Sequence, residues 1–121
     1  MPSSAIALIS IAVAVALFVI WGSLGRRSVH QLGAFLDRGA LILDVRTPGE
    51  FRQLQVNGAI NIPVDQVEGR LSELGPPGPI IVYCATGMRS RTTAKLLRSQ
   101  GFDVLDVGAL VNFPSDSLQR G

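Results

Sequence analysis

Apolar residues along this chain of 121 residues fall into one long run and several short ones. The long run extends from Ala5 to Leu24 and is interrupted only by Ser10, Gly22 and Ser23. As a helix it would span about 30 Å, which is the thickness of the hydrocarbon layer of a bilayer. The pattern therefore predicts one transmembrane helix near the start of the chain.

The flanks of this run favour an anchor over a cleaved signal peptide. No basic side chain precedes the run, no small-residue cleavage motif follows it, and it is long for the apolar part of a signal peptide. Trp21 lies near the end of the run, where an indole suits the membrane interface. Arg26 and Arg27 follow the end of the run. We therefore expect residues 1–27 to form a single-pass anchor with a basic flank. Since the only flanking basic residues follow the run, the remaining domain is predicted to be cytoplasmic.

The short apolar runs predict an α/β domain over residues 28–121. Four of them are too short for helices and are rich in β-branched residues, which is typical of buried strands. These predicted strands are residues 41–45, 59–62, 80–84 and 104–107. Amphipathic segments between them predict helices at residues 29–36, 65–74 and 91–100. Strands that alternate with helices in this way indicate a mainly parallel sheet.

Residues that begin or end helices support this division. Thr47, Pro48, Gly49 and Glu50 have the form of a capping box and predict a helix directly after the first strand. Asp65 and Glu68 repeat the pattern before the segment 65–74, Ser28 can cap the first helix, and Gly101 suits the end of the last one.

Charge and cysteine content exclude several classes of function. The net charge is only +2, the arginines are scattered, and every charged residue lies at or after Arg26, so a nucleic-acid-binding stripe is not expected. The single cysteine excludes a disulfide within the chain and argues against a cysteine-based metal site. The sequence implies no metal and no organic cofactor.

That cysteine, Cys84, ends the strongest predicted strand, and a short loop then leads into a helix. Backbone N–H groups in such a loop turn inward and form an anion-binding nest, which lowers the pKa of a thiol. Gly87 can adopt a positive φ there, and Arg89 adds a planar cation suited to sulfonate or phosphate oxygens. The alternative is a small core residue at a strand end, which is common for free cysteines. The Gly-Met-Arg-Ser sequence that follows favours a reactive cysteine.

Several ordered motifs resemble those of rhodanese-homology domains over residues 28–113. They are Leu43-Asp-Val-Arg-Thr-Pro-Gly-Glu-Phe51, Asn57-Gly-Ala-Ile-Asn-Ile-Pro63 and Ile81-Val-Tyr-Cys-Ala-Thr-Gly-Met-Arg-Ser90, followed by Lys95-Leu-Leu, Gly101-Phe102 and Val104 to Gly108. The resemblance implies a five-stranded parallel sheet flanked by helices, and the transmembrane helix predicted from the apolar run would precede it. It also implies a sulfurtransferase that moves sulfane sulfur from thiosulfate or a persulfide to a thiol or cyanide, as a persulfide on Cys84.

The resemblance assigns roles to the residues around Cys84. Substrate-binding residues would be Ala85, Thr86, Gly87, Met88, Arg89 and Ser90. Within this group Arg89 would orient the anionic donor, and Ser90 is expected to cap the following helix. Supporting residues would be Asp44, Arg46 and Glu50, with Arg46 paired to a carboxylate. The resemblance implies a small sulfur-containing anion and a thiol acceptor as partners, and the apolar run adds the membrane as a third.

Some positions depart from the family pattern, and two other functions stay open. Gln55 stands where many members have His, and Ala109 and Phe113 replace a usual Gly and Trp. Cysteine-dependent phosphatases are one alternative, but the segment between Cys84 and Arg89 is one residue shorter than theirs. The other alternative is a non-catalytic rhodanese-like binding or sensor module at the membrane.

Overall fold

The computed structural model of this chain describes residues 10–18 and 30–121. The chain divides into two units, residues 1–30 and residues 31–121. In the first unit, residues 10–18 are helical and their side chains are exposed. In the second, a helix that ends at residue 37 precedes the first strand.

The predicted membrane anchor is not supported. Its residues 5–9 and 19–24 lie outside the described residues, and so does the basic flank at Arg26 and Arg27. A helix needs about 20 apolar residues to cross the hydrocarbon layer. Within the described ranges no helix has the length and apolar character for this. The predictions of a transmembrane helix, a membrane partner and a membrane localisation with a cytoplasmic domain are therefore corrected.

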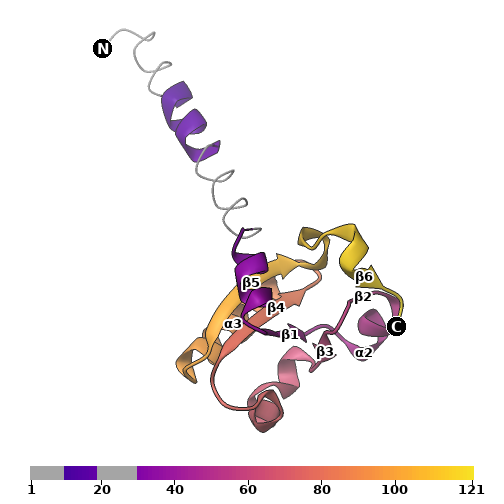
Figure 1. Cartoon of the computed structure of the whole chain (residues 1–121). Helices are drawn as coiled ribbons and strands as arrows, with labels where there is room; N and C mark the ends of the chain where they lie inside the picture. Colours follow the sequence, from indigo (N-terminus) through magenta and orange to yellow (C-terminus); the bar gives the residue numbers. More distant parts are fainter. Residues whose placement is uncertain (1–9, 19–29) are drawn as a thin grey trace, which may run out of the picture. The chain divides into compact units, whose positions relative to one another are not determined.

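The second unit is built on a parallel sheet of four strands in the order β3-β1-β4-β5 (Figure 1). The strands are β1 (Leu41–Asp44), β3 (Ile60–Asn61), β4 (Pro79–Cys84) and β5 (Asp103–Ala109). These are the four strands that the apolar runs predicted, although β3 is shorter than expected. The longest strands, β4 and β5, are neighbours, and β1 lies on the other side of β4.

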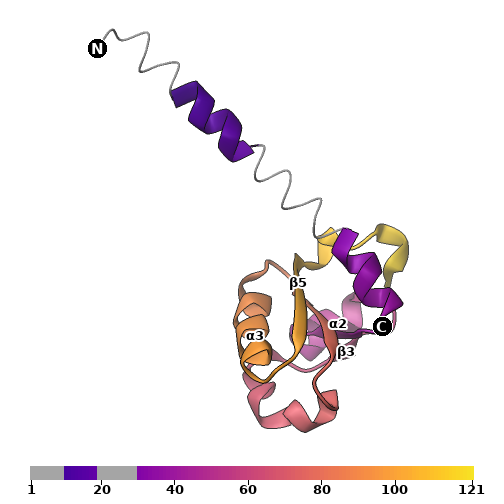
Figure 2. The ribbon, with the colours of Figure 1, turned by 60° about the vertical axis from the view of Figure 1, so that its left-hand side comes forward.

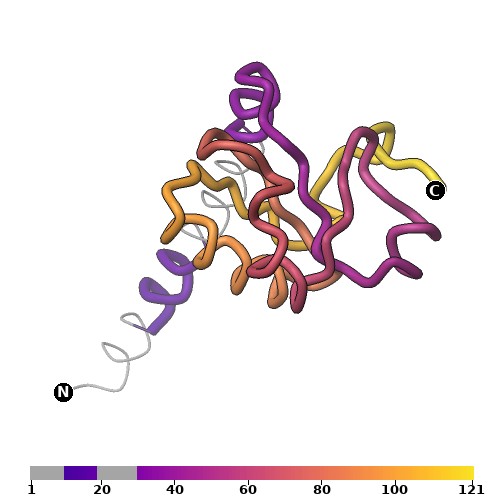
Figure 3. Tube along the Cα trace, turned by 90° about the horizontal axis from the view of Figure 1, so that it is seen from below, coloured from indigo at the N-terminus to yellow at the C-terminus, as the bar shows by residue number. Residues whose placement is uncertain are grey.

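The fifth parallel strand that the family resemblance implied is absent from this sheet of the second unit. The remaining strands, β2 (Gln55–Val56) and β6 (Leu118–Gln119), form a separate antiparallel pair (Figure 3). A turn directly after β2 explains this: Gly58 has a φ of +80°, and the N–H of Ala59 donates to the carbonyl of Val56. The turn separates β2 from β3, and β2 pairs with the end of the chain instead.

Helices cover both faces of the sheet, as a parallel sheet requires (Figure 2). The helix α3 (Met88–Ser99) packs on one face, and the helix that ends at residue 37 lies on the other. Side chains of a strand alternate between faces. Ile80, Val82 and Cys84 of β4 therefore point into the core beneath α3, whereas Ile81 and Tyr83 point into the opposite core.

The shorter helices differ in part from the predictions. The helix α2 (Pro48–Gln53) begins with the predicted capping box, and Thr47 and Glu50 make both of its hydrogen bonds. The predicted helix 65–74 is instead two 3-10 helices, η1 (Val64–Gln66) and η2 (Glu68–Leu74), and neither has a side-chain cap. A kink at Arg70 interrupts η2. The capping role of Ser28 lies outside the described residues.

The remaining helices complete the domain. The helix α3 begins three residues before the predicted position, directly after Gly87, and Gly101 follows its end with a φ of +91°. Beyond β5, the chain forms two short 3-10 helices, η3 (Leu110–Asn112) and η4 (Ser115–Ser117), before β6.

A buried ion pair lies at the carboxyl end of β1. Asp44 and Arg46 are 0% and 5% exposed, and Arg46 Nη2 lies 2.6 Å from Asp44 Oδ2. Arg46 Nε and the Arg46 backbone N–H donate to the same carboxylate. Burial alone would lower the pKa of Arg46, but hydrogen bonds and charge attraction from Asp44 outweigh it, and the pKa is raised. Arg46 therefore keeps its positive charge inside the protein.

This pair connects several elements. Arg46 Nη2 also donates to the carbonyl of Leu54, which follows α2, and the guanidinium lies 5.6 Å from the centre of the Tyr83 ring. The amide of Asn61 in β3 donates to the carbonyls of both Asp44 and Arg46.

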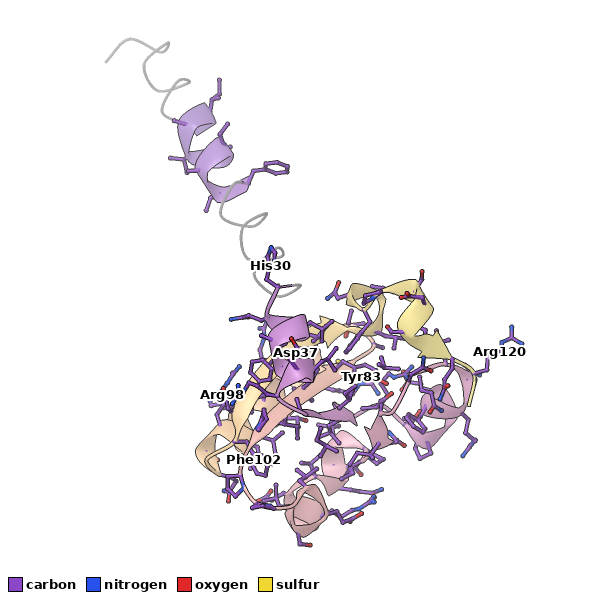
Figure 4. All side chains as sticks on the ribbon, in the orientation of Figure 1. His30, Asp37, Tyr83, Arg98, Phe102 and Arg120 are labelled. Carbon is purple, nitrogen blue, oxygen red and sulfur yellow. The ribbon has the colours of Figure 1, made fainter. Side chains whose placement is uncertain are left out.

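Tyr83 lies in the interior of the domain, whereas Arg120 projects outward (Figure 4).

We predict that Asp44→Asn lowers the free energy of unfolding by about 3–5 kcal/mol, because Arg46 would keep a buried charge without a counterion. Urea denaturation of both proteins measures the difference. Asp103→Asn is the matched control, since it breaks an ion pair at the surface. In that pair the side chain of Arg38 is 50% exposed and that of Asp103 is 58% exposed. The control should change stability by less than about 1 kcal/mol. An equally small effect at Asp44 would contradict the prediction.

Candidate active site

Cys84 is the last residue of β4, and its side chain is fully buried. It points to the face of the sheet that α3 covers. The loop Ala85–Gly87 connects it to the first residue of α3 (Figure 2). The strand thus delivers the sulfur to the amino end of a helix, where backbone N–H groups have no helical partners.

Two of those N–H groups donate to the sulfur. The N–H of Gly87 lies 2.9 Å from Cys84 Sγ, and the N–H of Ser90 lies 3.4 Å from it. Gly87 has a φ of +101° and stands at the N-cap position of α3. This left-handed conformation is one that residues with a Cβ rarely adopt. Glycine therefore allows the loop to fold back onto the sulfur, as the sequence predicted.

The environment favours the thiolate form of Cys84. Burial by itself would raise the pKa of the thiol, but hydrogen bonds from Ser90, Gly87 and Thr86 act in the opposite direction. Together these hydrogen bonds outweigh the effect of burial, and the pKa of Cys84 is lowered below its usual value. The positive end of the α3 dipole acts in the same sense.

Ser90 does not cap α3, so this prediction was wrong. It lies inside the first turn of the helix, it is buried, and its Oγ donates to the carbonyl of Gly87 over 3.1 Å. Its backbone N–H is directed at Cys84 Sγ instead. The difference arises because α3 begins at Met88, earlier than the apolar pattern indicated.

Arg89 is held by a carboxylate of α2. Its Nη1 and Nη2 atoms lie 2.8 Å and 3.1 Å from the two carboxylate oxygens of Glu50. Hydrogen bonds from Arg89 are the main reason that the pKa of Glu50 falls to about 2. The pKa of Arg89 is raised, first by Glu50 and also by the charges of Cys84 and Asp44. Arg89 also directly precedes Ser90, whose backbone N–H donates to the sulfur.

The other predicted loop residues face solvent. Ala85, Thr86 and Met88 are exposed, and Met88 is 77% exposed. The inner side of the loop is thus formed by backbone groups, and its outer side by these three side chains.

Asp44 and Arg46 form the buried pair described above, so the predicted pairing of Arg46 with a carboxylate is present.

Gly108 is a neighbour of the loop that the sequence analysis did not identify. A Cβ on Gly87 would lie 3.6 Å from Gly108 Cα, so the loop packs directly on the end of β5. Gly108 has a φ of +80°, and its N–H donates to Asp106 Oδ1 over 2.9 Å. The Asp-Val-Gly sequence is typical of a side-chain-supported turn and could have indicated this position.

Within residues 10–18 and 30–121, no three or more His, Cys, Asp or Glu side chains come together as a metal site would require. His30 is exposed. The arrangement provides a buried thiol with a lowered pKa, two backbone donors to its sulfur, and a loop cation paired with a carboxylate. These groups suit nucleophilic chemistry at Cys84 on an electron-poor centre.

Comparison with curated proteins gives several relatives. The chain is 30% identical over 96 residues to thiosulfate sulfurtransferase GlpE of Pseudomonas fluorescens, a match that covers 74% of this chain and 88% of that protein. It is 36% identical over 62 residues to thiosulfate sulfurtransferase PspE of Escherichia coli, covering 50% and 60% of the two chains. The uncharacterized protein YqhL of Bacillus subtilis is 39% identical over 64 residues, covering 53% and 51%. The chain thus spans less than two thirds of the length of several curated relatives that it matches.

Solved structures and a family model also give matches to this chain. A rhodanese from E. coli, solved with anions, is 31% identical with a TM-score of 0.60, and the match covers 68% of this chain and 99% of that one. The Alr3790 protein from Anabaena is 28% identical with a TM-score of 0.62, covering 75% and 88%. Residues 28–110, well over half of the sequence, match the rhodanese-like domain family. This chain belongs to the rhodanese-like domain family.

Proposed function

We propose that this protein is a sulfurtransferase that carries sulfane sulfur as a persulfide on Cys84. The observation that supports this most directly is the pair of backbone N–H groups, from Gly87 and Ser90, that donate to a fully buried sulfur. A cysteine that only filled the core would not need two donors directed at it. We propose that the catalytic domain begins at residue 28.

The first half-reaction loads the sulfur. The Cys84 thiolate attacks the outer sulfur of thiosulfate, a new S–S bond forms, and the bond to the sulfonate breaks with its electron pair leaving on sulfite. With a thiol persulfide as donor, the thiolate of that donor leaves instead. The backbone donors that stabilise the thiolate are preorganised, so they need no rearrangement during the attack.

The second half-reaction transfers the sulfur from the persulfide to the acceptor. A thiolate or cyanide acceptor attacks the outer sulfur of the persulfide, and the Cys84 thiolate leaves with the electron pair of the S–S bond. A low pKa makes Cys84 a good leaving group in this step. The hydrogen bonds from Gly87 and Ser90 therefore assist both halves of the cycle.

The surrounding residues take supporting roles in this proposal. The backbone of Ala85, Thr86, Gly87, Met88 and Ser90 forms the cradle for the transferred sulfur. Arg89 is paired with Glu50 and would orient the anionic donor through its remaining N–H groups, which suit sulfonate oxygens. The Asp44–Arg46 pair and Glu50 hold the neighbouring elements in place. The names of the relatives GlpE and PspE support thiosulfate as the first donor to test.

We predict that thiosulfate adds one sulfur atom to the full-length protein and that the protein then forms thiocyanate from cyanide. Both should be lost in Cys84→Ser, because this is the only cysteine in the chain. Intact mass measures the first property and a thiocyanate assay the second. A folded protein that gained no sulfur from any sulfane donor would contradict the proposal and favour a binding module. Release of phosphate from an aryl phosphate would favour a phosphatase.

We also predict that Gly87→Ala raises the pKa of Cys84 toward the ordinary thiol value of about 8.5. A Cβ disfavours the φ of +101°, so the loop N–H should move away from the sulfur. The rate of iodoacetamide alkylation, followed against pH, gives the pKa. The alkylation midpoint should lie at lower pH in the unmodified protein than in the variant.

Gly39→Ala is the matched control for this experiment. Gly39 also has a positive φ, of +73°, with no atom within 4 Å of an added Cβ. It precedes the amino end of β1, whereas Cys84 lies at the carboxyl end of the parallel strand β4. Both substitutions should destabilise the fold by about 1–3 kcal/mol. Only the one at Gly87 should move the alkylation midpoint. Equal midpoints in the two variants would show that the loop N–H does not set the thiolate.

A further inference from the structure

The cation beside the candidate nucleophile is not free. Both terminal nitrogens of Arg89 are bonded to Glu50, one to each carboxylate oxygen. The two side chains are 32% and 33% exposed, so solvent reaches the pair. A donor that approaches Cys84 thus meets a neutral ion pair rather than an unpaired guanidinium.

Glu50 is fixed in this position by its own helix. The backbone N–H and the hydroxyl of Thr47 both donate to Glu50 Oε1, over 3.2 Å and 3.1 Å. In return, the Glu50 N–H donates to Thr47 Oγ1. The carboxylate is therefore a rigid part of the start of α2, unlike most surface carboxylates. It remains ionised at neutral pH, since its pKa is about 2.

The neutralised cation affects donors according to their charge. Thiosulfate carries two negative charges, whereas a thiosulfonate such as methanethiosulfonate carries one and offers the same kind of sulfane sulfur. Repulsion from the Glu50 carboxylate and competition for Arg89 both grow with the charge of the donor. An unpaired Arg89 would favour the dianion, and a paired Arg89 favours it less.

We propose that Glu50 is a specificity-determining residue that disfavours dianionic sulfur donors relative to singly charged ones. It does so by neutralising the charge of Arg89 and by accepting one hydrogen bond from each of its two terminal nitrogens. This inference rests on the proposed sulfurtransferase activity, and it assigns the donor class: singly charged thiosulfonates and persulfides of thiols in preference to thiosulfate.

The experiment compares thiosulfate with methanethiosulfonate in the full-length protein and in Glu50→Gln, with cyanide as acceptor. Glutamine removes the charge but can still complete a capping box, so α2 should keep its start. We expect the ratio of kcat/KM for thiosulfate to that for methanethiosulfonate to rise about fivefold. The change should appear mainly in KM for thiosulfate, and it should shrink at high salt.

Glu73→Gln is the matched control. It makes the same substitution in another Arg–Glu pair, with Arg70, whose side chains are 36% and 49% exposed and which belongs to η2. The donor ratio should stay at the value of the unmodified protein. Glu50→Asp keeps the charge, so it should retain most of the discrimination even though its shorter side chain weakens the cap.

A second background tests whether the effect passes through Arg89. In Arg89→Gln, the additional change Glu50→Gln should shift the donor ratio far less than it does when Arg89 is present, as coupled residues do in a double-mutant cycle. An equal shift in both backgrounds would overturn the proposed mechanism. An unchanged or lowered ratio in Glu50→Gln would overturn the assignment of Glu50 itself.

Intact mass separates this inference from the proposed function. If Cys84 gains sulfur from both donors but the ratio does not respond to Glu50, only the specificity assignment fails. If Cys84 gains sulfur from neither donor in the folded protein, the sulfurtransferase proposal fails, and the inference fails with it.

Discussion

The ion pair between Asp44 and Arg46 holds together the edge of the sheet at which the candidate site lies. Its two charges are almost completely withdrawn from water, so each depends on the other. Through Asn61 the pair connects to β3, through Leu54 to the end of α2, and through the Tyr83 ring to β4. One buried polar cluster thus connects β1, β3, β4 and the end of α2.

This arrangement separates two electrostatic tasks. The buried pair connects the elements of the scaffold, and the pair between Glu50 and Arg89, which is one-third exposed, is in contact with solvent. The helix α2 links them, since Arg46 contacts its carboxyl end and Glu50 lies in its first turn. The same short helix therefore carries a contact to each of the two ion pairs.

Sequence patterns predicted the features that arise from local interactions. The apolar run before Cys84, the capping box at Thr47 and the glycine after α3 each depend on neighbouring residues, and the structure contains all three. Features that require distant segments to meet were missed or misjudged. The contact between Glu50 and Arg89 joins residues 39 positions apart, and the packing of Gly87 on Gly108 also depends on the folded sheet. The fifth strand was inferred from the family and not from a run in this chain.

The inner surface of the Cys84 loop consists of backbone N–H groups, while Ala85, Thr86 and Met88 face outward. A main-chain amide is supplied by almost any residue, so the groups that contact the sulfur do not depend on these three side chains. The outward positions are accordingly free to diverge or to be randomised in the laboratory. The outer face of the loop can therefore change while the backbone groups around Cys84 stay the same.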